Sequence, residues 1–191
     1  MWLFGKKKQM ENNNYLKRQV LATMSGMWGI WDYDSYNMID SYDSWAPVFE
    51  EDETIIQQIK EHHFIPINIM SDGAFQFAIK RNDILSDREK RYLTVESKEY
   101  LYHTTGKTIV SGIEYINKSI DASEGIEIEL APGYYEIKVC LVEWDSEPGA
   151  YNKDGSVNEN ALPDFIIMIN NVENLKETYR EEMETFETPE V

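Results

Sequence analysis

The sequence predicts a mainly β protein, an antiparallel β-sandwich with flanking N-terminal and C-terminal helices. From residue 64 onward, apolar and polar residues alternate in several short runs, the pattern of half-buried strands. Turn signals such as Pro132-Gly133 separate these runs. No helix-length amphipathic segment lies between them, which argues against βαβ units and a parallel sheet.

Two helices are predicted before the β region. Apolar residues recur at helical spacing over residues 13–25, and Gly26 then ends the pattern. A second short helix is expected over residues 54–61, with Thr54 as its N-cap. Pro66 prevents this helix from continuing further.

The β region contains six clear strand candidates. They are residues 75–80, 100–103, 108–116, 126–130, 134–144 and 165–169. The Thr104-Thr105-Gly106-Lys107 sequence predicts a hairpin between the second and third. The last candidate is nearly all apolar, so we expect a central strand buried on both faces.

A C-terminal helix is predicted over residues 173–191. Leu175, Tyr179, Met183 and Phe186 form one apolar stripe at helical spacing. Acidic residues occupy the opposite face. The stripe either packs on the sandwich or binds a partner, and both alternatives remain open.

Four segments follow from this reading. We expect a mobile basic arm (1–12), a helical and acidic-aromatic segment packed on the main domain (13–64), the sandwich (65–172) and the acidic C-terminal helix and tail (173–191). Residues 1–18 carry five basic residues against one acid. The arm lacks the order of a targeting segment, because its basic cluster follows its apolar residues.

The charge of the whole chain limits its partners. The 191 residues include 18 Lys and Arg against 35 Asp and Glu, a formal net charge of −17. Binding to nucleic acid or to an anionic membrane needs basic surface, so neither is expected. No apolar run is long enough to span a bilayer. The single cysteine excludes an internal disulfide, and we expect a cytoplasmic bacterial protein of undetermined oligomeric state.

Searches for catalytic chemistry yield little, so we predict no catalytic residues, no cofactor and no metal. The chain has no metalloprotease, Cys-x-x-Cys or Gly-rich phosphate motif. Cys140 lies within an apolar strand, where a thiol is usually inert. A carboxylate-based hydrolase stays open as an alternative, since acid pairs are too abundant to be diagnostic.

Two loops carry the alternative of a small-ligand or Ca²⁺-binding module. Asp32 to Asp43 places oxygens at five positions of a Ca²⁺ loop, but Asn37 replaces the structural glycine and Asp43 the final glutamate. Asn152 to Asn158 resembles part of such a loop and also fits a polar turn at Asp154-Gly155.

Residues 28–53 form the most unusual segment. They hold eight acids and seven aromatics but no Lys or Arg. Trp and Tyr are favoured anchors of binding interfaces, and acids attract a basic partner. The aromatics would equally well cover one end of the sandwich. The partner-binding candidates from this segment are Trp28, Trp31, Asp32, Tyr33, Asp34, Tyr42, Asp43 and Trp45.

The segment from Asp145 to Leu162 is a second candidate contact surface. It is long for a hairpin connection, which favours a role in recognition. Its acidic residues are the remaining partner-binding candidates, Asp145, Glu147, Asp154 and Glu159.

Residues 65–172 resemble the ComJ-like competence nuclease inhibitors of bacilli, small proteins that restrain a DNA-entry nuclease. The likeness rests on residues 71–77 (Ser-Asp-Gly-Ala-Phe-Gln-Phe), 112–116, 130–137 (Leu-Ala-Pro-Gly-Tyr-Tyr-Glu-Ile) and 163–167 (Pro-Asp-Phe-Ile-Ile). The N-terminal 64 residues and the acidic C-terminus depart from that pattern. The resemblance implies a non-enzymatic inhibitor or immunity-type protein whose partner is a basic protein such as a nuclease or toxin.

Overall fold

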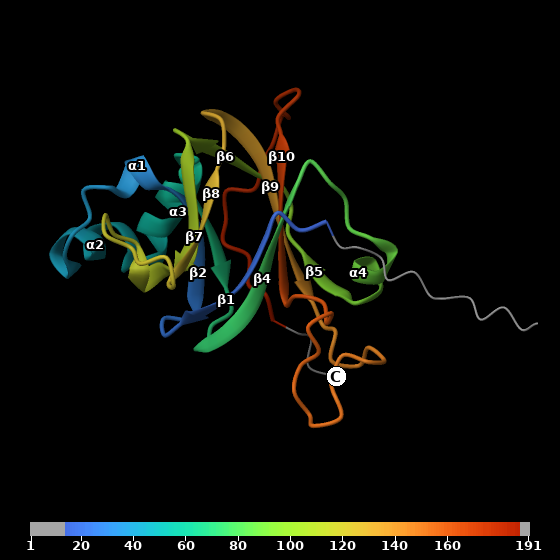
Figure 1. The fold of residues 1–191 in the computed structure, drawn as a ribbon. Coiled ribbons are helices and arrows are strands. Elements are labelled where there is room, and N and C mark those ends of the chain that lie inside the picture. The colour runs from blue at the N-terminus through green and yellow to red at the C-terminus, as the bar shows by residue number, and fades with distance from the viewer. Residues whose placement is uncertain (1–13, 188–191) are drawn as a thin grey trace, which may run out of the picture.

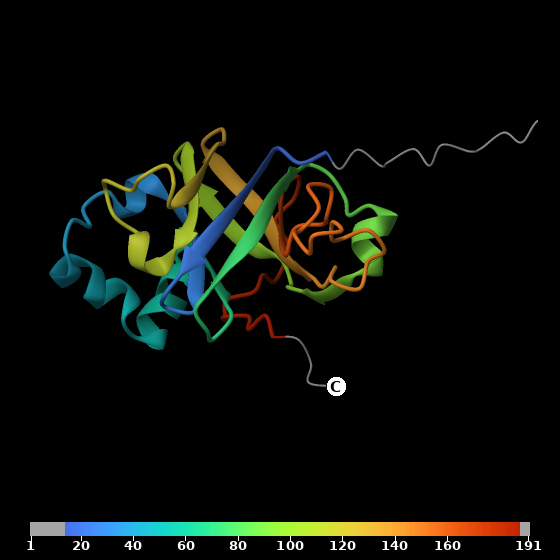
Figure 2. The ribbon, with the colours of Figure 1, turned by 60° about the horizontal axis from the view of Figure 1, so that its bottom comes forward.

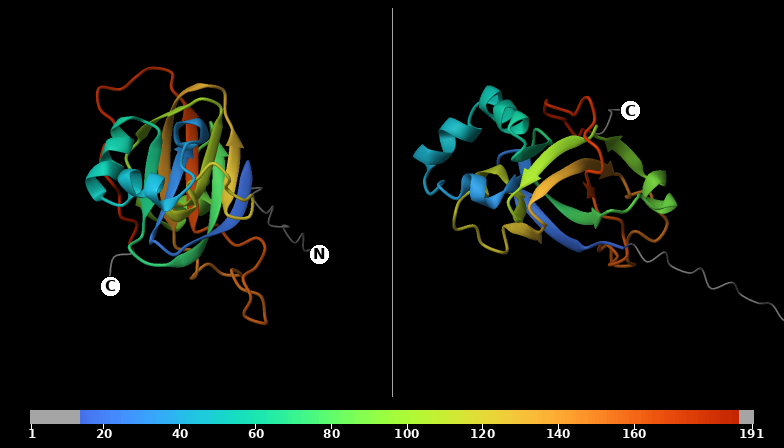
Figure 3. Two further views of the ribbon diagram at one scale, coloured as in Figure 1. Left: turned by 90° about the vertical axis from the view of Figure 1, so that its left-hand side faces the viewer. Right: turned by 90° about the horizontal axis from the view of Figure 1, so that it is seen from above.

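The computed structural model describes residues 14–187 and confirms a mainly β protein with two sheets (Figure 1). The arm predicted over residues 1–12 lies outside the described residues. Seen from above, the sheets face each other, with helices outside one and a long loop outside the other (Figure 3).

The larger sheet has six strands, and one of its pairings is parallel. From one edge the order is β1, β4, β10 and β9, and both β5 and β6 pair with the far edge of β9. β10 runs parallel to β4, with Phe165 opposite Phe77. The predicted antiparallel sandwich is therefore confirmed, except that this one pair of strands is parallel. The strands are β1 (Lys17–Thr23), β4 (Gly73–Arg81), β5 (Leu93–Glu96), β6 (Tyr100–Thr104), β9 (Gly133–Val142) and β10 (Phe165–Asn171).

The smaller sheet has four antiparallel strands in the order β3, β2, β7 and β8. They are β2 (Met27–Asp32), β3 (Phe64–Asn68), β7 (Lys107–Gly112) and β8 (Gly125–Glu129). Every residue of β2 is buried, because the sheet on one side and helices on the other cover it.

The predicted hairpin at residues 104–107 does not form. β6 pairs with β9 in the larger sheet, whereas β7 pairs with β2 and β8 in the smaller one. The turn therefore carries the chain from one sheet to the other. Both strands exist, but the second ends at Gly112, where a 3-10 turn replaces the rest of the strand predicted over residues 108–116. Each strand finds its hydrogen-bonding partner elsewhere.

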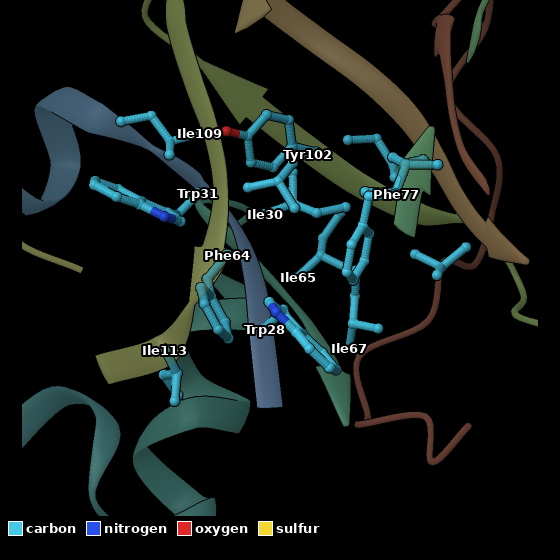
Figure 4. Packing of buried hydrophobic residues seen from close by; sticks show 14 of the residues in the cluster. Trp28, Ile30, Trp31, Phe64, Ile65, Ile67, Phe77, Tyr102, Ile109 and Ile113 are labelled. Atoms are coloured by element: carbon cyan, nitrogen blue, oxygen red, sulfur yellow. The ribbon is translucent and has the colours of Figure 1, made fainter. Parts of the chain in front are cut away.

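The main core lies between the two sheets. Trp28 of β2 packs against Phe77 of β4, with ring centroids 5.2 Å apart (Figure 4). Phe77 in turn stacks on Phe165 of β10, with ring centroids 5.0 Å apart. Such aromatic pairs add to the stabilisation from burial alone. β10 is buried on both faces, as predicted, because Ile166 and Met168 belong to a second core.

The second core lies on the outer face of the larger sheet. Cys140 and Val142 of β9 pack there with residues of the 144–162 loop, among them Trp144 and Leu162. The loop therefore covers apolar sheet surface in addition to presenting polar residues (Figure 2).

Four helices and one 3-10 turn connect the strands. They are α1 (Tyr33–Tyr36), α2 (Tyr42–Phe49), α3 (Asp52–Lys60), α4 (Asp87–Arg91) and η1 (Ile113–Tyr115). The helix predicted at residues 54–61 is α3, whose N-cap is Glu51 rather than Thr54. Within residues 14–187, no helix combines the length and apolar character that crossing a bilayer requires.

The helix predicted over residues 13–25 does not form in the part of this stretch that is described, residues 14–25. Most of this stretch is β1, which pairs with β4 along its whole length. Leu21 and Thr23 point into the core, while Val20 and Met24 stay exposed. The exposed apolar residues of the outer face completed an apparent helical spacing, although the period that matters is two.

Residues 173–187 form an extended segment, which we call the C-terminal strap, instead of the predicted helix. Its backbone bonds other elements: the Arg180 N–H donates to Glu99 and the Phe186 N–H to Asn68. It thus links the edge of β6 to the end of β3. Phe186 enters the core against Phe165. Acids four residues apart, such as Glu173 and Glu177, would also repel in a helix.

Candidate functional site

Two predicted partner-binding aromatics are core residues. Trp28 and Trp31 are fully buried. The Trp31 indole N–H donates to the Ser111 hydroxyl at 3.1 Å, inside the smaller sheet. Neither side chain is available to a partner, so their prediction as contact residues was wrong. They hold helices and sheets together, which was the other role that the sequence allowed.

Asp32 is also buried and serves as an internal hydrogen-bond acceptor. One carboxylate oxygen accepts the Thr105 N–H at 2.8 Å and the hydroxyls of Thr104 and Thr105 at 3.0 Å. The other accepts the Ser35 N–H and hydroxyl. Burial alone would raise the pKa of Asp32, but these donated hydrogen bonds outweigh it and hold the pKa below its usual value. Asp32 fastens the turn between the sheets to α1, so it is not a contact residue.

Helix α2 presents the exposed part of the acidic-aromatic segment. Tyr42 is 64% exposed, and its hydroxyl donates to Glu50 at 2.8 Å. Asp43 is also exposed, at the first turn of the helix. Trp45 is half-buried, and its indole N–H donates to the Ile113 carbonyl. The ring of Trp45 therefore has its polar group satisfied inward and contributes apolar surface.

Three adjoining hollows surround and extend from α2, and we call them together the acidic trough. The first and second share Ser25 and Trp45. The second and third share Ser71. Of the residues that the structure describes, those lining the trough include nine carboxylates and no Lys or Arg. These carboxylates belong to Asp40, Glu50, Asp52, Asp72, Glu114, Glu143, Asp145, Asp164 and Glu187.

The surface of the trough has a single sign of charge. Within residues 14–187, Asp40 is the only one of these nine acids that pairs with a lysine. Its partner is Lys118 at 2.9 Å, and both side chains are about half exposed. Asp164 is half-buried between the Gln76 N–H and the Trp144 indole N–H, and burial raises its pKa. A concentration of carboxylates without bases makes the local potential more negative than the net charge alone would.

Most trough residues were not found from the sequence. Met24, Met70 and Asp72 lie in two turns far apart in the chain, and Glu114 lies in η1. The neighbouring glycines, Gly26 and Gly73, are the sequence signals that could have indicated these two turns. Tyr42, Trp45 and Asp145 are the predicted residues that the structure places in the trough.

Tyr33 and Asp34 lie outside the trough. The Tyr33 hydroxyl donates to the Lys118 carbonyl, and the Lys107 ammonium lies 4.4 Å from its ring centroid. Asp34 is exposed and shares the single Thr105 hydroxyl proton with Asp32. Both are engaged locally, and their role in partner binding stays a prediction.

The acids of the 144–162 loop are separated from one another. Glu147 forms a two-bond ion pair with Arg88 at 2.6 Å, which fastens the loop to α4. Asp154 accepts the N–H and hydroxyl of Ser156, the expected polar turn. Glu159 is exposed. Of this set, Asp145 alone lines the trough.

The proposed Ca²⁺ loops do not gather oxygen ligands. Asp32 is occupied by Ser and Thr donors, and the chain is helical at Tyr33–Tyr36, where a Ca²⁺ loop must bend. Among residues 14–187, no group of three or more His, Cys, Asp or Glu side chains is arranged to hold a metal ion. Cys140 is buried, and burial raises the pKa of its thiol to about 12.

Comparison with known proteins identifies the fold. No family model and no curated protein matches the sequence. Two solved structures are similar to the chain at low sequence identity. One is the protein described as Crocagin biosynthetic gene J, with a TM-score of 0.50 and 15% identity over 80% of this chain and 94% of that one.

The other solved structure is ComJ from Bacillus subtilis, described as the inhibitor of the DNA-degrading activity of NucA. It matches with a TM-score of 0.48 and 13% identity over 83% of this chain and 97% of that one. The predicted resemblance is thus confirmed as a likeness in structure, and it extends beyond residues 65–172. At these identities the likeness concerns the fold.

Proposed function

We propose that this protein is a non-enzymatic binding protein, of the inhibitor or immunity type, that engages a basic protein through the acidic trough. The observation that carries the proposal is the one-signed lining of the trough, nine carboxylates without a Lys or Arg. ComJ is described as a nuclease inhibitor, a member of this class of function. The proposal rests on the trough.

The trough suits a protein partner better than a small cation. Its three hollows adjoin one another and combine acids with aromatic side chains such as Tyr42 and Trp45. Aromatic anchors supply contact area at low entropic cost, and complementary charge speeds association. An enzyme that handles nucleic acid presents basic surface for phosphates, which this trough would cover directly.

The test is retention of a basic protein by the immobilised chain. A lysate of the source organism is applied at about 50 mM NaCl and eluted with rising salt, because Coulombic binding weakens as the Debye length shortens. We expect a basic protein that elutes well before about 1 M NaCl. The purified partner must then lose its activity when mixed with the chain at equal concentration.

Two variants with equal change of charge locate the surface. Neutralising Glu50, Asp52 and Asp72 to their amides is expected to reduce retention at least tenfold. The matched control neutralises Glu129, Glu173 and Glu177, which are exposed and line none of the three hollows. Equal retention by both variants, or no basic protein in the eluate, would contradict the proposal.

A further inference from the structure

The second hollow of the trough is lined by methionine. Four of the eight methionines in the chain surround it: Met24, Met27, Met70 and Met183. Met24 and Met70 are 72% and 70% exposed, unusually high for large apolar side chains. Methionine is flexible and polarisable, so it adapts to apolar ligands of varied shape.

The backbone holds the two exposed methionines beside each other. Met24 lies in the turn between β1 and β2, and Met70 in the turn between β3 and β4. The Gly26 carbonyl accepts the N–H groups of Ile69 and Met70, at 2.9 and 3.2 Å. Gly26 has a φ of +68°, and a Cβ there would lie 2.9 Å from the Ser71 nitrogen. The close approach of the two turns therefore requires glycine.

The floor of the hollow is apolar and its rim is acidic. Trp45, Phe49, Ile55 and Ile113 line the floor, and the hollow measures about 560 Å³. The rim carries three exposed acids, Glu50, Asp52 and Asp72. An apolar strip bordered by carboxylates is complementary to a segment that is apolar on one side and basic on the other.

The hollow offers few backbone groups for pairing with an extended segment. The Gly26 carbonyl is taken by Ile69 and Met70, and the Asn68 carbonyl by the Phe186 N–H of the C-terminal strap. β2, which begins beside the hollow, already has a partner strand on both sides. A bound segment must therefore satisfy its own backbone hydrogen bonds, which an α-helix does.

We infer that this hollow, which we call the methionine groove, binds an amphipathic basic helix of the partner. Apolar side chains at helical spacing enter between Met24 and Met70. Lys or Arg residues on the flanks of the helix meet Glu50, Asp52 and Asp72. This inference rests on the proposed function and adds the class of segment that the trough recognises.

Two synthetic peptides of equal composition test the inference. The first, about 18 residues of Leu and Lys, places leucines at positions i, i+3, i+4 and i+7. The second has the same residues in an order without a helical apolar face. Fluorescence anisotropy at about 150 mM NaCl is expected to show at least tenfold tighter binding of the first. Equal affinity, or no binding of either, would overturn the inference.

A methionine variant supplies the matched control. Met24→Ser combined with Met70→Asn, where Asn tolerates the φ of +60° at position 70, should weaken the amphipathic peptide at least tenfold. Met38→Ser should not, because Met38 is 82% exposed but lines none of the trough hollows. Unchanged affinity in the groove variant would contradict the inference.

A readout without mutation and two distinguishing outcomes complete the test. The ¹³C-methyl NMR signals of Met24, Met70 and Met183 should shift on peptide binding, while that of Met38 should not. Retention of a basic protein without peptide binding refutes the groove and leaves the proposed function standing. Dimers that the groove variant dissociates, without peptide binding, would assign the groove to a second copy and refute the inference.

Discussion

At the scale of the residue, Asp32 shows how an acid in an acidic sequence becomes structural. The carboxylate receives donors from α1 and from the turn between β6 and β7, and no base lies among these partners. A buried anion is tolerable where several aligned N–H and O–H groups replace its water. The residue therefore stabilises the crossing between the two sheets.

Replacing this carboxylate should be costly. Asp32→Asn directs an amide NH₂ at the Ser and Thr donors, and we expect a loss of about 2–3 kcal/mol in the free energy of unfolding at pH 7. Urea denaturation followed by tryptophan fluorescence measures it. Asp34→Asn, which removes one exposed acceptor, is the control and should change stability by about 0.5 kcal/mol or less. Equal effects of the two variants would contradict the prediction.

The same residue predicts a pH dependence of stability. Because the folded pKa of Asp32 lies below that of the unfolded chain, about 3.9, its contribution is complete above that value. It is lost as pH falls through the folded pKa. The difference in unfolding free energy between the natural chain and Asp32→Asn should thus be constant from pH 7 to about pH 5 and shrink below pH 4. A difference that grows in acid would refute it.

Cys140 should be unreactive in the folded state. Burial raises the pKa of its thiol to about 12, so almost no thiolate exists at pH 8. We expect no labelling by a thiol reagent over several minutes in buffer, and complete labelling in 8 M urea. With one cysteine in the chain, the signal is unambiguous. Rapid labelling of the native protein would show that the second core opens readily.

At the scale of the element, the sequence predicts strands well where one face is buried and the other is exposed to solvent. β8 and β9 have that alternation, and β10 is the apolar run expected of a central strand. β2 is buried throughout and lies in an acidic segment, so no period marks it. Which strands hydrogen-bond to each other is harder still to predict, because the choice between the two sheets depends on contacts distant in the sequence.

The C-terminal strap shows why a correct apolar pattern still gave the wrong element. Met183 and Phe186 do face the protein, as the stripe required. They do so from an extended chain whose N–H groups are satisfied by Glu99 and Asn68. Tertiary hydrogen bonds thus replaced the helical ones, and nothing within residues 173–191 announces that exchange.

Phe186 should make the strap essential to stability. Its ring lies 5.7 Å from that of Phe165 and is 3% exposed. Phe186→Ala leaves a cavity in the core and should cost about 3–5 kcal/mol in chemical denaturation. Leu175→Ala, at a residue 67% exposed on the same strap, should cost less than about 0.5 kcal/mol. A small effect at Phe186 would mean that the strap is not part of the core.

At the scale of the whole molecule, the negative net charge has two effects. It favours binding of a basic partner, and it opposes folding. The −17 charge repels itself in the compact state, and salt screens this repulsion. We expect the melting temperature to rise by several degrees between about 10 and 150 mM NaCl. An unchanged or falling melting temperature would show that attractive pairs such as Arg88–Glu147 outweigh the repulsion.

The candidate site was only partly predictable because it is assembled across the molecule. The acidic-aromatic segment correctly indicated Tyr42 and Trp45 on the surface, since α2 leaves one side to solvent. Trp28 and Trp31 have the same residue type and fill the core. The methionine groove joins two turns and the strap, and only their meeting in space turns scattered methionines into a surface.

The parallel pairing of β10 with β4 sets the order in which the protein can be made. β4 emerges from the ribosome long before β10, its neighbour in the middle of the larger sheet. Until then β4 and β9 each keep one unpaired edge, a template for aggregation. Chains cut short before residue 165 should therefore be insoluble. The last 27 residues, which begin with β10, must therefore be made before the larger sheet can close.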